Sequence, residues 1–353
     1  MISVAKAVVD LPKAALALLF LFLVACAREP EAVIRLDGQT MGTTYHVTLI
    51  NPGNLHGDEL KRQLDYQLQH FNQIASTYID DSELNTLNRA SIGEWLPVSE
   101  PLFNILSLAV EVSWLTGGAF DITVAPLVDL WGFGPRKRQG KPSAEEIEAE
   151  MAKVGFNRLE LDMLEPKLRK TAALQMDLSA IAKGYGVDAA AIWLESLGVT
   201  DYLVEIGGEM RVAGKSPRGD AWRIGVENPG ADNAAMLAIE LGDIAVATSG
   251  DYRNYFEEDG VRYSHTIDPR TGSPITHRLA SVTVLDASCA FADAMATGFS
   301  VLGAERTLKL AEASDIPVYL LEKTEQGFVA RYSSAFKPYL PVATPNTAVE
   351  GEQ

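Results

Sequence analysis

The fold class is inferred first from residues 174–208, which read LQMDLSAIAKGYGVDAAAIWLESLGVTDYLVEIGG. Alternating apolar residues predict a strand over 174–178, and the helix that follows runs to about Leu197, where Gly198 ends it. A second strand is predicted over 202–206, before a Gly-Gly turn. Along the whole chain, strands and helices are interspersed without a strict βαβ rhythm, which favours an α+β fold over a doubly wound parallel sheet.

Other segments show the same two periodicities. Helical spacing predicts helices ending near Ile74, over 101–115 and from Ser143 onward. Alternation predicts strands at 41–50, 222–227, 235–241 and 281–285.

Two neighbouring stretches, 247–256 and 264–274, are too polar for core strands. They gather hydroxyls, Arg side chains, an Asp and His265 around turn-forming Gly and Pro, a composition suited to a polar, phosphorylated ligand. A neutral imidazole at His265 can take a proton from an attacking hydroxyl. The alternative is a structural His that bonds a neighbouring turn.

The 353 residues are 47% hydrophobic and carry a formal net charge of −17. The hydrophobic content is enough for a full core. The excess of acid argues against nucleic acid as a partner and against electrostatic attachment to anionic lipid, because both favour basic surfaces. An acidic chain also repels a phosphorylated ligand, so we expect a divalent metal to accompany it.

Asp293, Ala296 and Thr297 lie on one face of a predicted helix. A carboxylate, a hydroxyl and a carbonyl are oxygen donors that suit Mg²⁺. For Ala296 to offer its carbonyl, the helix must be distorted locally, and Gly298 makes such a distortion plausible. The alternative for Asp293 is a cap or a buried hydrogen-bonding group.

Two further segments are candidate ligand contacts. Asp177 precedes a helix whose first turn offers free N–H groups to an anion, and Lys183 adds a cation near that end. The alternative is that Asp177 or Ser179 caps the helix while Lys183 is solvated.

Residues 117–126 combine small residues with Asp121, although a plain turn explains them as well. Gly207-Gly208-Glu209 is explained by a tight turn without any ligand.

The N-terminal segment, residues 1–25, is expected to be a secretory signal. Its apolar run, 14–25, is shorter than the roughly 20 residues needed to span a bilayer. Leu23-Val24-Ala25-Cys26 resembles the lipobox of bacterial lipoproteins, which implies acylation of Cys26 and a lipid anchor. The alternative is an ordinary signal with a chance Cys. With Cys26 lipidated, Cys289 has no partner for a disulfide.

The motifs together resemble the ApbE family of bacterial FAD:protein FMN transferases, which are periplasmic lipoproteins. The resemblance covers nearly all of the mature chain. It rests on segments 41–45, 118–123, 177–186, 206–209, 247–256, 264–274 and 292–297.

The resemblance implies an ApbE-like (T-fold-like) architecture, with mixed and antiparallel sheets flanked by helices and a smaller subdomain. It places this transferase domain at 36–341, after a lipidated linker at 26–35 and before a disordered tail at 342–353. It also implies a lipoprotein anchored in the bacterial cell envelope, facing the periplasm.

The implied activity is Mg²⁺-dependent cleavage of the FAD pyrophosphate. FMN would pass to a Thr or Ser hydroxyl of an acceptor protein, a subunit of an Nqr- or Rnf-type redox complex, and AMP would be released. His265 would be the base. The implied contacts to FAD are Met41, Tyr78, Ala119, Phe120, Asp121, Asp177, Lys183 and Ile267. The implied metal ligands are Ala180 through its carbonyl, Asp293, Ala296 and Thr297.

Ala296 departs from some relatives, which carry an acidic residue there. If only its carbonyl binds metal the change is harmless, whereas a lost carboxylate would weaken metal affinity. Two other functions stay open. One is an FAD pyrophosphatase, in which water replaces the acceptor hydroxyl. The other is a non-catalytic lipoprotein that binds FAD, although storage needs no base.

Overall fold

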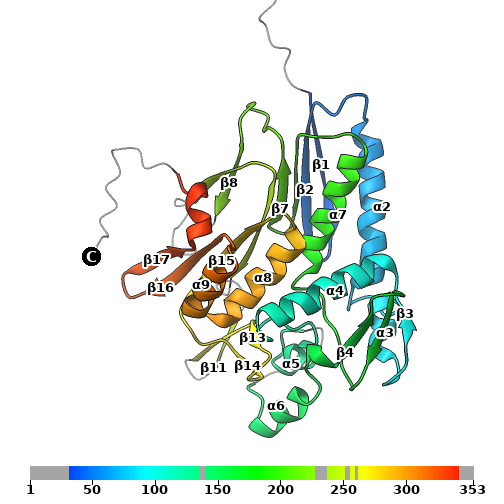
Figure 1. Ribbon diagram of the computed structural model, residues 1–353, viewed down its shortest axis with the longest axis vertical. Coiled ribbons are helices and arrows are strands. Elements are labelled where there is room, and N and C mark those ends of the chain that lie inside the picture. Colours follow the sequence, from blue (N-terminus) through cyan, green and yellow to red (C-terminus); the bar gives the residue numbers. More distant parts are fainter. Residues whose placement is uncertain (1–31, 135–139, 227–236, 251–254, 259–260, 342–353) are drawn as a thin grey trace, which may run out of the picture. The chain divides into compact units, whose positions relative to one another are not determined.

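The computed structural model of the chain describes residues 32–134, 140–226, 237–250, 255–258 and 261–341 (Figure 1). The chain divides into two units, Met1–Ala32 and Val33–Gln353, and the fold below is that of the second. The expected signal, Cys26 and the tail at 342–353 lie outside the described residues.

An eight-stranded sheet organises this unit, and each of its strands pairs antiparallel with its neighbours. Its order is β1 (Val33–Thr40), β2 (Thr43–Ile50), β6 (Tyr202–Ile206), β7 (Glu209–Ala213), β10 (Ile244–Gly250), β15 (Leu279–Asp286), β16 (Val318–Thr324) and β17 (Gly327–Tyr332). The predicted strand at 202–206 is confirmed. The prediction at 41–50 holds from Thr43 onward, because Met41 and Gly42 form the turn from β1, a strand that the sequence did not indicate.

Helices cover one face of this sheet. Helices α7 (Ala182–Ser196) and α8 (Cys289–Leu302) pack on its central strands, α2 (Gly57–Ala75) on β1 and α9 (Ala304–Ala313) on β16 (Figure 1). Helix α4 (Glu100–Leu115) packs against α8. The predicted helices over 101–115 and up to Ile74 are confirmed.

The other face is covered by the hairpin of β8 (Trp222–Val226) and β9 (Leu237–Leu241) and by the 3-10 helix η2 (Ser334–Tyr339). Apolar residues of β8, β9 and η2 form one core cluster with Val212, Val246 and Leu285 of the sheet. Strand β15 is therefore buried on both faces, which explains its nearly unbroken apolar run.

The remaining elements surround the ends of these layers. They are α3 (Glu83–Arg89), α5 (Ala125–Leu130), α6 (Ala144–Met151), η1 (Phe156–Arg158), the sheet of β3 (Leu96–Pro97), β5 (Lys167–Lys170) and β4 (Leu159–Asp162), and the pairs β11 (Tyr255–Glu258) with β12 (Val261–Ser264) and β13 (Ile267–Asp268) with β14 (Ser273–Pro274). Helix α6 starts at Ser143 with a full capping box, as its sequence predicts. Within the described ranges, no helix is long and apolar enough to cross a membrane. The α+β class is confirmed.

The predicted strand at 174–178 is wrong. Leu174, Met176 and Leu178 are buried, as the alternation indicates. However, the backbone of Met176 bonds the side chain of Asn88 in both directions, at 2.7 and 2.9 Å, and Asp177 donates its N–H to the Ile122 carbonyl. The segment is thus an extended connection. Its backbone bonds the Asn88 side chain and the loop at Ile122, and among the described residues it does not pair with a neighbouring strand.

The interpretation of 247–250 as outside the core is also wrong. These residues end β10, a strand in the middle of the sheet, and Ala247 is fully buried. Thr248 is tolerated there because its hydroxyl bonds that of Thr283 on β15, at 2.9 Å.

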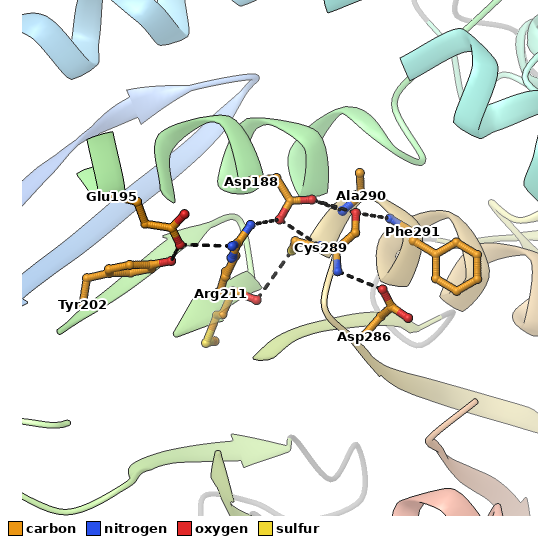
Figure 2. A network of polar contacts seen from close by, with 10 residues as sticks. Asp188, Glu195, Tyr202, Arg211, Asp286, Cys289, Ala290 and Phe291 are labelled. Carbon is orange, nitrogen blue, oxygen red and sulfur yellow. Dashed lines mark hydrogen bonds and ion pairs between the residues drawn. The ribbon is translucent and has the colours of Figure 1, made fainter. Parts of the chain in front are cut away.

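Asp188 of α7 caps the start of α8 (Figure 2). Its Oδ1 accepts a hydrogen bond from the N–H of Cys289 and its Oδ2 from that of Ala290, both at 3.0 Å. Arg211 of β7 lies against the same carboxylate, Nη1 to Oδ1 at 3.2 Å. The first N–H groups of a helix have no partner inside it, so this cap joins α7, α8 and β7. The Cys289 thiol is fully buried, and burial raises its pKa well above the ordinary value.

Candidate functional site

The first turn of α7 touches the first turn of α8 through a glycine. A Cβ built on Gly184 would lie 2.3 Å from the Cys289 carbonyl oxygen. The Gly184 N–H donates to Asp293 Oδ2 at 3.0 Å. Close approach of the two backbones thus brings the start of α7 to the Asp293 carboxylate.

We expect Gly184→Ala to lower the free energy of unfolding by about 1 to 3 kcal/mol, because its methyl group meets rigid backbone. Replacing a glycine inside a helix by alanine ordinarily stabilises the folded protein, by about 0.5 to 1 kcal/mol. A destabilised Gly184→Ala variant would therefore indicate the close approach of the two backbones. Gly186→Ala is the matched control, since its methyl group meets only side-chain ends, those of Met41 and Ile206, and no backbone. Chemical denaturation measures both, and a stabilised Gly184→Ala variant would contradict the close approach.

Lys183 lies between two buried carboxylates. Its Nζ is 2.9 Å from Glu209 Oε1 and 3.5 Å from Asp293 Oδ1. Glu209 is 3% exposed and Asp293 5%. Burial alone would lower the pKa of the Lys183 ammonium, but the two carboxylates outweigh burial and raise it. Burial and the charge of Asp293 raise the pKa of the Glu209 carboxyl, against the opposing effect of Lys183.

This trio fits an additional cation. With both carboxylates ionised it carries one net negative charge. The pKa of Glu209 is raised first by burial and then by the charge of Asp293. The buried Oε2 of Glu209 accepts no hydrogen bond from the described residues. No backbone N–H among those residues donates to the Ala180 carbonyl, because the Gly184 N–H turns to Asp293 instead.

Thr297 follows Asp293 by one helical turn on α8 and is partly exposed. Together with the Ala180 carbonyl they supply the hard oxygen donors that Mg²⁺ prefers. Clusters of three or more His, Cys, Asp or Glu side chains with metal-binding geometry do not occur in the part of the chain that the structure describes. A cation here would therefore rely on carbonyl, hydroxyl and substrate oxygens besides Asp293.

The local distortion expected around Ala296 is not present. Helix α8 is continuous from Cys289 to Leu302, and Ala296 is 1% exposed. Gly298 serves packing instead, since a Cβ there would lie 2.8 Å from Thr116 Cγ2 and 3.2 Å from Phe120 Cβ. The geometry thus gives no support to Ala296 as a ligand.

The loop at 119–121 is held rigidly beside these helices. Asp121 accepts hydrogen bonds from the Thr123 N–H and hydroxyl and from the Phe156 N–H, at 2.7 to 3.0 Å. Burial raises the pKa of Asp121, although these bonds oppose the rise. Ala119 and Phe120 are buried. The carboxylate of Asp121 is therefore occupied within the protein, and the loop can meet a ligand mainly through its backbone.

Asp177 precedes the start of α7, and Met41 lies against its first turns. Asp177 Oδ1 accepts from the Ser179 N–H at 2.7 Å, and neither residue caps α7, whose N-cap Ile181 makes no side-chain cap. The Met41 side chain lies against Gly186. Tyr78, between α2 and α3, is 72% exposed and stands apart from the trio.

His265 follows β12 and its ring lies 6.3 Å from that of Phe133, edge to face. The loop after it is fixed from α5 by Trp131, whose Nε1 donates to the Gly272 carbonyl at 2.8 Å. The Ile267 side chain is buried in a separate core cluster with Leu127, so it is not part of the trio.

Sequence reasoning missed Glu209. A Gly-Gly turn explained the segment fully, and nothing local separates a strand-end Glu that points inward from one in solvent. The available signal was charge. Strand β7 carries one acidic and one basic residue, Glu209 and Arg211, and α7 carries Lys183 and Asp188. In the structure Glu209 pairs with Lys183, and Arg211 pairs with Asp188.

The chain matches known proteins over most of its length. Residues 41–320 match the family model of the ApbE family. The FAD:protein FMN transferase of Vibrio cholerae is 46% identical over 327 residues, which are 92% of this chain and 98% of that protein. The solved flavin transferase ApbE from Vibrio cholerae superimposes with a TM-score of 0.83, at 46% identity, over 88% of this chain and 100% of that one. The apo flavinyl transferase ApbE from Pseudomonas stutzeri gives 0.83 at 40% identity, over 89% and 98%.

Proposed function

Because the chain belongs to the ApbE family, we propose how its own residues carry out the transfer of FMN from FAD to protein that its relatives are named for. The chain is a transferase of this class, and the expected ApbE-like architecture is confirmed. The observation that supports our account best is the trio of partly buried Lys183 with buried Glu209 and Asp293, which carries one net negative charge when both carboxylates are ionised.

We propose that this site uses Mg²⁺. Asp293, Thr297 and the Ala180 carbonyl would hold the ion. When bound, Mg²⁺ neutralises pyrophosphate oxygens and stabilises the AMP leaving group. Lys183 would contact the same phosphates as a point charge. The backbone of the rigid loop at 119–121, together with Met41, Tyr78, Asp177 and Ile267, would orient FAD.

The chemical step needs one base. The hydroxyl oxygen of the acceptor Thr or Ser attacks the phosphorus of the FMN half of FAD. The bond from that phosphorus to the bridging oxygen breaks, and AMP leaves. His265 takes the hydroxyl proton, so protein-bound FMN and AMP are the two products.

Direct assay separates this proposal from the two alternatives. A protein comprising residues 27–353 is incubated with FAD, with and without Mg²⁺, and with a Thr-containing acceptor domain of an Nqr- or Rnf-type subunit. A gain in acceptor mass equal to FMN, matched by AMP and dependent on Mg²⁺, is expected. AMP with only free FMN would indicate a pyrophosphatase, and FAD binding without AMP would indicate a carrier.

We also propose that Cys26 carries lipid and anchors the protein to a membrane of the bacterial envelope, facing the periplasm. The lipobox-like residues 23–26 support this. Cys26→Ser is expected to give a soluble or unprocessed protein, because lipid attachment at this thiol would be lost. Cell fractionation with mass spectrometry of the N-terminus measures it. A processed variant that stays in the membrane fraction would refute the anchor.

A further inference from the structure

Strand β7 carries two charged side chains on the face that meets α7. Glu209 and Arg211 are two residues apart and point to the same side of the sheet. Glu209 pairs with Lys183 and Arg211 with Asp188, so two ion pairs of opposite polarity connect one strand with one helix. Sliding α7 along β7 would bring like charges together, so the two ion pairs favour the observed register of the helix.

The Lys183 ammonium lies closer to the Glu209 carboxylate than to the Asp293 carboxylate. Its Nζ forms a close ion pair with Glu209, at 2.9 Å, and a longer one with Asp293 Oδ1, at 3.5 Å. Asp293 already uses Oδ2 for the Gly184 N–H, so Oδ1 is its remaining open acceptor. An ammonium that moved onto Oδ1 would neutralise the carboxylate and occupy the position that a cation needs.

We propose that Glu209 is a positioning residue that holds Lys183 away from Asp293 and so keeps the Asp293 carboxylate open to Mg²⁺. The inference rests on the proposed metal dependence. Glu209 reaches the site through Lys183: without its charge, Asp293 is the ionised partner that remains for the partly buried ammonium among the described residues. Attraction between charges is strengthened where water is partly excluded.

The test measures Mg²⁺ binding to the full soluble domain, residues 27–353, by isothermal titration calorimetry without FAD. Glu209→Gln keeps the shape and removes the charge. We expect the Mg²⁺ dissociation constant to rise about 10- to 100-fold, the usual loss when a residue that supports a metal ligand is removed. Arg211→Gln is the matched control, because it breaks the neighbouring ion pair on the same strand without touching Lys183 or Asp293; its Mg²⁺ affinity is expected to stay near that of the wild type.

The Lys183→Met variant separates two effects of Glu209: its positioning of Lys183 and its own negative charge near the metal site. In Lys183→Met no ammonium competes for Asp293, so adding Glu209→Gln is expected to change the Mg²⁺ dissociation constant little. Thermal unfolding of each variant checks the fold independently. An unchanged constant in Glu209→Gln, or a loss of full size in the Lys183→Met background, would overturn the inference. Absence of Mg²⁺ binding by the wild type would overturn the metal proposal as well.

Discussion

Asp293→Asn is expected to lower the rate of FMN transfer by at least about 10²-fold, because one ionised ligand of the proposed cation is lost where charge develops on the leaving group. The fold is expected to survive, since the Asn side-chain oxygen can still accept the Gly184 N–H that now bonds Oδ2. Release of AMP and the mass of the acceptor, followed over a range of Mg²⁺ concentrations, measure the effect. Part of the loss is expected to be recovered at high Mg²⁺.

Asp286→Asn is the matched control. Asp286 is a half-buried carboxylate near the start of α8, but it bonds the Ser288 N–H at 2.8 Å and lies outside the trio. Its variant is expected to keep wild-type Mg²⁺ dependence. Equal losses in the two variants, or full activity of Asp293→Asn in chelator-buffered solution, would count against the metal site.

His265→Ala is expected to slow transfer by about 10² to 10⁴-fold while FAD binding changes little, because a base acts on the hydroxyl proton only as the bond to phosphorus forms. The imidazole ring lies edge to face with Phe133, 6.3 Å between ring centroids. Single-turnover rates and flavin fluorescence titrations measure the two quantities separately. Free imidazole is expected to restore part of the rate.

His70→Ala, at an exposed position on α2, controls for removal of an imidazole from the surface. It is expected to behave as the wild type. If His265→Ala weakened FAD binding as much as it slowed transfer, His265 would be a structural residue that shapes the pocket.

The parts of the fold that could be predicted are those whose periodicity is set by burial on one face. Helix α2 and strand β6 are such elements: α2 ends one residue from its predicted end near Ile74, and β6 spans the predicted 202–206. Segment 174–178 has the same alternation, yet a single amide side chain, that of Asn88, replaces a strand as its partner. Periodicity reports which side chains are buried and says nothing about what bonds the backbone. Strand β1 was missed because only Leu36 and Thr40 of its eight residues are buried.

The candidate site was predictable where several unusual residues stand in one segment. Lys183 and Asp293 were found in this way, and the structure brings them to 3.5 Å from each other. Glu209 was missed because its partner lies 26 positions away on another element, and a Gly-Gly turn already explained its neighbours. The prediction of a distorted helix at Ala296 was wrong. Gly298 is needed because Thr116 and Phe120 pack closely against it. The sequence of the helix alone does not reveal that contact.

Cys289 opens α8 one helical turn before Asp293, and its thiol is fully buried with a pKa held far above neutrality by burial. Thiol–disulfide exchange and oxidation need a reachable thiolate, and this sulfur offers neither access nor charge. The helix start that carries the Asp293 carboxylate is thus indifferent to redox conditions. Mild oxidants and reductants are therefore expected to leave this thiol, and the helix start that it opens, unchanged.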